Sequence, residues 1–150
     1  MEVEEVGVEA TFALRAKVLR AGVEGSDVRF PSDEHPQALH LAVSDEHGRA
    51  VAVVSAVPAP TERRPGRSAW RLRGMAVEPA LQGRGLGAEL LDAVVERCRG
   101  EGAEVIWADG RDSALGFYRR RGWAVEGEGY DKIGIPHHTV VLDLGVEPGR

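Results

Sequence analysis

The amino-acid sequence predicts a mixed α/β fold in which a central, mostly antiparallel sheet is flanked by helices. Two patterns support this class. Segments with alternating apolar residues, which are typical of strands, occur on both sides of one long amphipathic helix. Two of these segments are separated only by the turn sequence Asp45-Glu46-His47-Gly48, which favours a hairpin. The length of 150 residues fits a single domain spanning residues 1–150.

The first half of the chain predicts three strands and one helix. Alternating valines favour a strand, apolar residues at helical spacing favour a helix, and a cluster of Gly, Ser, Asp and Pro favours an irregular connection. In chain order we expect a strand at 3–8, a helix at 9–20, an irregular connection at 22–36, hairpin strands at 38–44 and 49–57, and a solvated loop at 58–68.

The second half predicts four strands and two helices, so that the whole order is β-α-β-β-β-α-β-α-β-β. We expect a strand at 70–77, a helix ending near 99, a buried strand at 103–108, a helix at 112–121 capped by Asp112, and strands at 123–126 and 138–144. Gly74 interrupts the alternation of its strand, which is typical of a bulge or of the close approach of another backbone.

The helix that ends near residue 99 has one apolar stripe. The stripe consists of Leu86, Leu90, Leu91, Val94, Val95 and Cys98. Cys98 is the only cysteine, so no intrachain disulfide is possible and the chain fits a reducing compartment. Its place on the stripe favours a core residue over an acyl carrier.

Charge and hydropathy exclude several classes of protein. The net charge is −5, whereas nucleic-acid binders are usually basic or carry a basic stripe. The N-terminal sequence has no signal-peptide pattern, and no apolar run approaches the length of a membrane helix. We therefore expect a cytoplasmic protein without a membrane or nucleic-acid partner.

The sequence Gln82-Gly83-Arg84-Gly85-Leu86-Gly87 lies between a predicted strand and the long helix. Glycine allows sharp turns and close approach of a ligand, and the first N–H groups of a helix have no intrahelical partner. The helix dipole adds partial positive charge there. The turn therefore suits a phosphate or a pyrophosphate.

Three interpretations of this turn compete. It is a tight connection without a ligand, a dinucleotide-binding loop, or the pyrophosphate site of coenzyme A. Gly83-x-Gly85-x-x-Ala88 formally matches the dinucleotide pattern of an NAD(P)-dependent oxidoreductase. In that fold, however, the glycines directly follow the strand, whereas residues 78–82, including Pro79, intervene here.

Two motifs resemble the GNAT superfamily of N-acetyltransferases. Its acetyl-CoA signature, Q/R-x-x-G-x-G/A, is similar to Met75-Ala76-Val77-Glu78-Pro79 followed by Gln82-Gly83-Arg84-Gly85-Leu86-Gly87. Its second signature, A-x-x-F-Y-x-x-x-G-F, is similar to Ala114-Leu115-Gly116-Phe117-Tyr118-Arg119-Arg120-Arg121-Gly122-Trp123. The first half is also similar to a subset of these proteins, through Leu14-Arg15 with Val18-Leu19-Arg20 and through Phe30-Pro31-x-Asp33.

The resemblance implies the acyl-CoA N-acyltransferase fold and an enzyme with acetyl-CoA as cosubstrate and no metal. It places the pantetheine arm in an opening between the strand ending at Val77 and the strand at 103–108, with the oxyanion near the Val77 N–H. Arg111 stands where many relatives have Asn, which leaves its role open. The implied cofactor contacts are Met75, Ala76, Val77, Gln82, Gly83, Arg84, Gly85, Leu86, Gly87, Arg111, Ala114, Phe117 and Tyr118.

Acetyl transfer to an amine needs a proton donor for the thiolate and a base for the amine. Tyr118 matches the donor position of the family; its alternative role is packing beside Phe117. The base is open between Glu78, which would otherwise be a solvated loop residue, and His137 or His138. Asp109 is a further candidate, although capping the next loop is its more expected role.

The acceptor follows from the resemblance only as a class: a primary amine of a small molecule or peptide, acetylated directly in a ternary complex. Family acceptor sites are built from variable loops, here expected at 22–37, 58–68 and 127–137. A non-catalytic acyl-CoA-binding module is the alternative, and a homodimer is consistent with the family. A solvated face, rather than a polyanion site, is expected for Arg63, Arg64, Arg67, Arg71 and Arg73.

Overall fold

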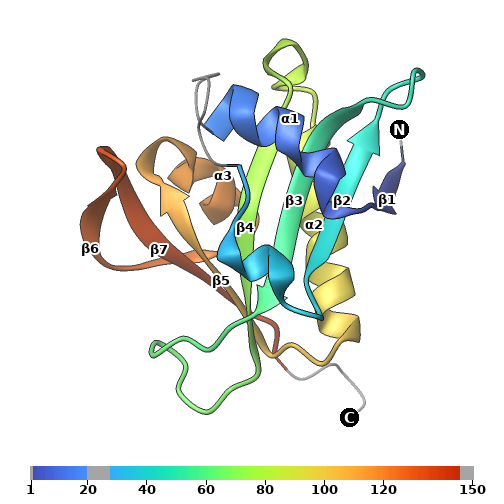
Figure 1. Cartoon of the computed structure of the whole chain (residues 1–150). Helices are drawn as coiled ribbons and strands as arrows, with labels where there is room; N and C mark the ends of the chain where they lie inside the picture. Colours follow the sequence, from blue (N-terminus) through green and yellow to red (C-terminus); the bar gives the residue numbers. More distant parts are fainter. Residues whose placement is uncertain (1, 20–27, 146–150) are drawn as a thin grey trace. The chain divides into compact units, whose positions relative to one another are not determined.

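The computed structural model describes residues 2–19 and 28–145 (Figure 1). The strands are β1 (Val3–Glu5), β2 (Leu39–Ser44), β3 (Ala50–Pro58), β4 (Ala69–Val77), β5 (Val105–Arg111), β6 (Ala124–Lys132) and β7 (Ile135–Asp143). The helical elements are η1 (Val8–Thr11), α1 (Phe12–Leu14), η2 (Arg15–Leu19), η3 (Pro31–Glu34), η4 (Pro79–Leu81), α2 (Leu86–Gly100), η5 (Asp112–Ala114) and α3 (Leu115–Arg120).

The strand order confirms the predicted mixed, mostly antiparallel sheet. The seven strands follow the order β1-β2-β3-β4-β5-β7-β6. The ladders β1–β2, β2–β3, β5–β7 and β6–β7 are antiparallel, and β4 pairs with β5 in parallel. This pattern differs from the doubly wound parallel sheet of a dinucleotide-binding fold. The dinucleotide interpretation of the glycine turn is therefore wrong.

The chain divides into two compact units, and each is described separately. The first unit comprises Met1–Val57 and Leu72–Arg97, and the second comprises Pro58–Arg71 and Cys98–Arg150. Strand β4 contributes residues to both units.

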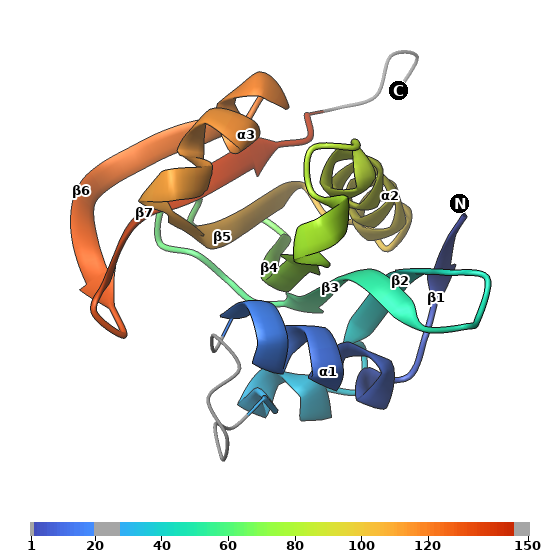
Figure 2. The same ribbon diagram turned by 90° about the horizontal axis from the view of Figure 1, so that it is seen from above.

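In the first unit, helices cover both faces of the strands. Figure 2 shows α1 and α2 on opposite sides of β3. One buried cluster joins Leu14 of α1 to Ala42, Val53 and Ala76 of the strands. The predicted stripe of α2 is confirmed, because its members are buried except for the half-buried Val95. Burial of this stripe supplies the hydrophobic stabilisation of the helix.

The predicted helix at 9–20 is present but irregular. It begins as a 3₁₀ turn at η1, continues through α1 and ends with the π-type turn η2; Arg20 lies outside the described residues. The first strand is shorter than predicted, because the N–H of Ala10 bonds to the carbonyl of Gly7 and starts the helical run. Of the expected connection at 22–36, residues 22–27 lie outside the described part and 31–34 form η3.

Gly74 meets a side chain rather than another backbone. Its φ is +66°, and a Cβ at this position would lie 2.9 Å from Cε2 of Phe30. The guanidinium carbons of Arg15 and Arg73 lie 4.0 and 4.3 Å from the centre of the same ring. The close approach at Gly74 is thus made by side chains, and not by another backbone as was predicted. The expectation that Arg73 lies on a solvated face is wrong, because it packs on Phe30.

In the second unit, three strands differ from their predicted bounds. Strand β5 continues to Arg111, so Asp109 is a strand residue and caps no loop. Strands β6 and β7 extend through most of the segment 127–137, which was expected to be a loop. An irregularity between Glu126 and Tyr130 accommodates the glycines that suggested a loop. The hairpin turns at Ile133 and Gly134, which both have positive φ.

The segment 58–68 is a largely exposed loop, as predicted, but Arg64 ties it to the strands of the second unit. Arg64 donates from Nε and Nη2 to the carboxylate of Asp143 at 2.8 and 3.0 Å. It also donates from Nη1 and Nη2 to the carboxylate of Glu126 at 3.1 and 2.8 Å. Fork-shaped bonding to two carboxylates fixes the segment beside β6 and β7.

Candidate functional site

The glycine turn follows η4 in the first unit. Gly83 and Gly85 have φ of +82° and +83°, and a Cβ on either would meet nothing within 4 Å. Backbone conformation, and not crowding, therefore requires glycine at both positions. The N–H of Glu89 bonds to the carbonyl of Gly85 at 3.0 Å, which makes Gly85 the first acceptor of α2. The N–H groups of Leu86 and the residues just after it are therefore the first of the helix, and such groups have no acceptor within their own helix.

The turn is exposed, and one of its own side chains anchors it. Gly83, Arg84 and Gly85 are exposed, whereas Leu86 is buried beneath them at 8% exposure and Gly87 is half-buried. The Gln82 side chain donates to the carbonyl of Val77 at 3.2 Å and so ties the turn to the end of β4. An open loop with positive φ, a helix N-terminus and a cation fit the pyrophosphate of a nucleotide cofactor.

The last residues of β4 alternate between the core and its other face. Ala76 is 2% exposed in the core of the first unit, whereas Met75 and Val77 are half-buried. Strand alternation therefore turns Met75 and Val77 away from the core. Their pairing with a pantetheine arm, and the opening beside β5, stay predictions.

Glu78 is not a free, solvated loop residue. Its carboxylate forms an ion pair with the ammonium of Lys17 on η2, and its N–H bonds to the carbonyl of Val51 at 2.8 Å. Both interactions lie within the first unit. A base at this position would therefore act beside a cation.

Tyr118 of the second unit is a buried residue of α3. It is 6% exposed, and its ring centre lies 5.4 Å from that of Phe117 and 5.2 Å from that of Trp123. Gly110 of β5 lies beside it: a Cβ there would lie 3.4 Å from the Tyr118 ring and 3.2 Å from Cγ1 of Val140. Burial raises the pKa of Tyr118 to about 12, so the phenol keeps its proton at neutral pH. This neutral state is the one that a proton donor needs.

Asp109 is the centre of a polar cluster on the second unit. It accepts hydrogen bonds from the Tyr130 hydroxyl, from Arg71 and, at 3.0 Å, from Nζ of Lys132. Burial raises the pKa of Asp109, but the bonds from Tyr130 and Lys132 and the charges of Lys132 and Arg71 outweigh it and lower the pKa to about 2. So acidic a carboxylate is a poor general base.

Arg71 was also expected on a solvated face, and this is wrong. Besides its ion pair with Asp109, its guanidinium carbon lies 5.0 Å from the ring centre of Trp107. The sequence did not single out Tyr130 and Lys132 because segment 127–137 was interpreted as a loop. Their spacing of i and i+2 along a strand would have placed both on one face.

The two histidines lie inside β7 and point to different partners. His137 is 7% exposed, its Nδ1–H donates to the carbonyl of Ile135 at 2.7 Å, and its ring stacks on Tyr130 with centres 6.1 Å apart. Nδ1 of His138 lies 2.7 Å from the carboxylate of Asp112. As neighbours on a strand, the two side chains point to opposite faces of the sheet. The prediction that the Asp112 side chain caps the helix is wrong. Arg111, and not Asp112, is the N-cap residue of η5, and no side chain forms a capping hydrogen bond with the start of this helix.

The remaining predicted contacts lie near the start of α3. Arg111 ends β5 opposite His137 and is half-buried. Ala114 and Phe117 are half-buried, and the Phe117 ring meets Tyr118 edge to face.

In the described part of the chain, no group of three or more His, Cys, Asp or Glu residues is arranged to hold a metal ion. No described helix is long and apolar enough to cross a membrane.

Comparison with known proteins identifies the family. The acetyltransferase (GNAT) family matches residues 12–123. The chain belongs to this family. It is therefore an acetyl-CoA-dependent acetyltransferase.

Individual relatives agree with this assignment. The uncharacterized N-acetyltransferase YitI of Bacillus subtilis is 28% identical over 141 residues, which cover 94% of each chain. An aminoglycoside 6'-N-acetyltransferase complexed with coenzyme A has a similar fold, with a TM-score of 0.78, 14% identity and 99% coverage of both chains. An acyl-CoA N-acyltransferase from Pseudomonas aeruginosa has a TM-score of 0.77, 17% identity and coverage of 93% of this chain and 97% of its own.

Proposed function

We propose that this enzyme moves an acetyl group from acetyl-CoA to a primary amine of a small molecule or peptide by direct transfer in a ternary complex. The observation that carries this proposal is the open glycine turn at the start of α2, where Gly83 and Gly85 adopt positive φ and no side chain fills the space above them. Such a turn suits the pyrophosphate of coenzyme A.

Several residues of the chain would hold the cosubstrate. The N–H groups at the start of α2 and the exposed cation of Arg84 would bind the pyrophosphate. The backbone of Met75 and Val77 would pair with the pantetheine arm, with the N–H of Val77 stabilising the oxyanion. Acetyl-CoA supplies an acetyl group activated as a thioester. Arg111, Ala114 and Phe117 are proposed contacts for the rest of the molecule.

The reaction joins the amine nitrogen to the acetyl carbon and breaks the bond from that carbon to sulfur. The attacking amine has to be neutral, so its ammonium form loses a proton first. Glu78, directly or through water, is the proposed acceptor of this proton, with His137 and His138 as further candidates. Tyr118 would donate a proton to the departing sulfur. Its burial and its raised pKa support this role, since they keep the phenol protonated.

The acceptor is proposed only as a class at this stage. Fold relatives include an aminoglycoside 6'-N-acetyltransferase, but a likeness at 14% identity supports the fold and not the acceptor. The single cysteine, Cys98, cannot form a disulfide within the chain, and this is compatible with the proposed cytoplasmic location.

An assay of products tests this proposal. The purified protein is incubated with acetyl-CoA and a panel of amines, and free thiol and acetylated amine are measured together. We expect both to appear in equal amounts. Acetyl-CoA binding without acetylation of any amine would instead support a non-catalytic acyl-CoA-binding module. An acetylated protein intermediate that forms without acceptor would contradict direct transfer.

A further inference from the structure

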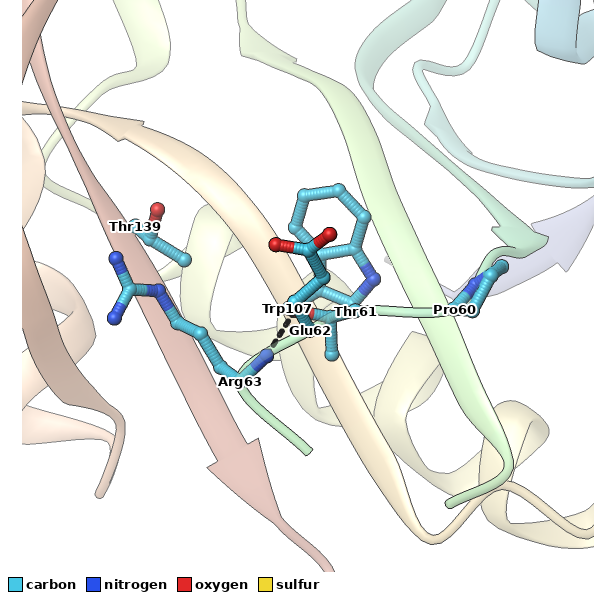
Figure 3. Close-up of a pocket in the computed structure, with 6 residues that line it drawn as sticks. All are labelled: Pro60, Thr61, Glu62, Arg63, Trp107 and Thr139. Atoms are coloured by element: carbon cyan, nitrogen blue, oxygen red, sulfur yellow. Dashed lines mark hydrogen bonds between the residues drawn. The ribbon is translucent and has the colours of Figure 1, made fainter. Parts of the chain in front are cut away.

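The second unit contains a depression that the proposed cosubstrate does not use. It has a volume of about 540 Å³ and is lined by Pro60, Thr61, Glu62, Arg63, Trp107 and Thr139 (Figure 3). This volume is in the range of small-molecule sites. One wall is the segment 58–68, and the other is formed by β5 and β7.

The wall formed by segment 58–68 is fixed before any ligand binds. Arg64 joins it to Glu126 of β6 and Asp143 of β7 through paired hydrogen bonds. At its start, the indole N–H of Trp107 donates to the carbonyl of Ala59 at 3.0 Å. A wall that is already ordered loses little conformational entropy when a ligand binds.

Trp107 offers an aromatic surface to the depression. Trp70 and Trp123 are 4% and 3% exposed, whereas Trp107 is half-buried. Its N–H bond to Ala59 holds the indole in place, so that the ring can contact an apolar part of a ligand.

Two opposite charges on the depression have no ion-pair partner among residues 2–19 and 28–145. Glu62 and Arg63 are both exposed and adjacent in sequence, and neither forms an ion pair there. The Arg63 guanidinium lies beside Gly127, where a Cβ would be 2.1 Å from its Nη2. Figure 3 shows the Arg63 side chain extending toward Thr139, with Glu62 on the same segment. A ligand with one positive and one negative group would satisfy both.

We propose that this depression binds an α-amino acid. The α-carboxylate would bind Arg63, the ammonium would bind Glu62, and the side chain would lie on Trp107. Binding of the amino acid does not depend on the proposed acetyl transfer. The net charge of −5 does not attract an amino acid, so recognition depends on these local groups.

The proposal is tested by binding without acetyl-CoA. Acrylamide quenching of tryptophan fluorescence reports on Trp107, since the other two tryptophans are buried. The probes are phenylalanine and lysine, the amines without their carboxylates (2-phenylethylamine and 1,5-diaminopentane), and the Nα-acetyl derivatives. We expect the amino acids to protect Trp107 at concentrations about tenfold lower than either derivative. The Trp107→Phe variant should show no protection.

Two variants separate the charges. Arg63→Gln should abolish the preference for the amino acid over its amine, and Glu62→Gln should abolish the preference over its Nα-acetyl derivative. Arg67→Gln is the matched control from the same segment; it removes only an exposed ion pair with Glu104 and should leave both preferences unchanged. The proposal is wrong if no probe protects Trp107, if the amines bind as tightly as the amino acids, or if the preferences survive both variants.

A parallel acetyl-CoA titration and transfer assay distinguish this proposal from the proposed function. Transfer to amines, without amino-acid binding, would overturn this proposal and leave the enzyme activity standing. Amino-acid binding without acetyl-CoA binding would overturn the acetyl transfer and leave the amino-acid site standing.

Discussion

Arg15 and Asp33 form a buried ion pair in the first unit, with side chains 1% and 8% exposed. Arg15 donates from both terminal nitrogens to the carboxylate at 2.8 and 3.0 Å, and also to Ser55 at 2.9 Å. Asp33 in turn accepts from the N–H of Phe30 at 2.8 Å. The pair joins the helical run, η3 and β3.

Removing one charge of this pair should strongly destabilise the protein. Asp33→Asn leaves the Arg15 guanidinium buried without its counter-charge, and we expect a loss of about 3–5 kcal/mol in the free energy of unfolding. Urea denaturation followed by circular dichroism measures this change in the free energy of unfolding. Asp131→Asn at an exposed position is the control and should change stability by less than about 0.5 kcal/mol. Equal, small effects of both variants would contradict a stabilising role of the pair.

Asp109 should make stability sensitive to acid. Its pKa is about 2 in the folded protein, below the usual 3.8 of an aspartic acid, so its contribution is fully present above about pH 4 and is lost as the pH falls toward 2. The difference corresponds to about 2 kcal/mol. We expect Asp109→Asn to be less stable than the wild type at pH 6 and to differ little from it at pH 2. If the difference in stability between the two proteins stayed constant from pH 6 to pH 2, the negative charge of Asp109 would not contribute to stability.

Ile133 is a site where a substitution should stabilise the protein. It is 73% exposed and has a φ of +56°, which is unfavourable for a β-branched residue. Ile133→Asn should raise the free energy of unfolding by about 1 kcal/mol, since Asn tolerates the left-handed region. Thermal unfolding compares it with Ile133→Val, which keeps the β-branch and should gain nothing. An unchanged melting temperature for Ile133→Asn would show that the turn is not strained.

Tyr118 should matter for the rate of transfer and not for binding of the cosubstrate. Tyr118→Phe keeps the ring contacts with Phe117 and Trp123 but removes the proton donor, so we expect kcat to fall about 10²–10⁴-fold. Because the pKa of Tyr118 is about 12, ionisation of the phenol should not limit the wild-type rate between pH 7 and pH 9. Steady-state kinetics and an acetyl-CoA titration test this together. Full activity of Tyr118→Phe would assign the residue to packing alone.

The sequence predicted the class of fold and the glycine turn because both depend on local patterns. Apolar alternation identified the strands, and the stripe from Leu86 to Cys98 identified α2. The failures involve long-range contacts. Arg64 and Arg71 were expected to be solvated, since the sequence does not show that Asp143 and Asp109 lie opposite them. Glycines at 127 and 129 suggested a loop, although pairing with β7 keeps them in a strand.

Acetyl-CoA binding at the glycine turn is the central claim, and two glycine variants test it. Gly85→Ala and Gly48→Ala both place a Cβ on a residue with positive φ, +83° and +76°, in open space. Both should lose about 1–2 kcal/mol of stability. Only Gly85 carries the proposed pyrophosphate site.

Calorimetric titration of the wild type and both variants with acetyl-CoA, and with NADH as a control ligand, is the most direct measurement. We predict that the wild type and Gly48→Ala bind acetyl-CoA with equal affinity and do not bind NADH, and that Gly85→Ala binds acetyl-CoA at least about tenfold more weakly. Equal acetyl-CoA affinity of all three proteins, or no binding by the wild type, would contradict the proposed site.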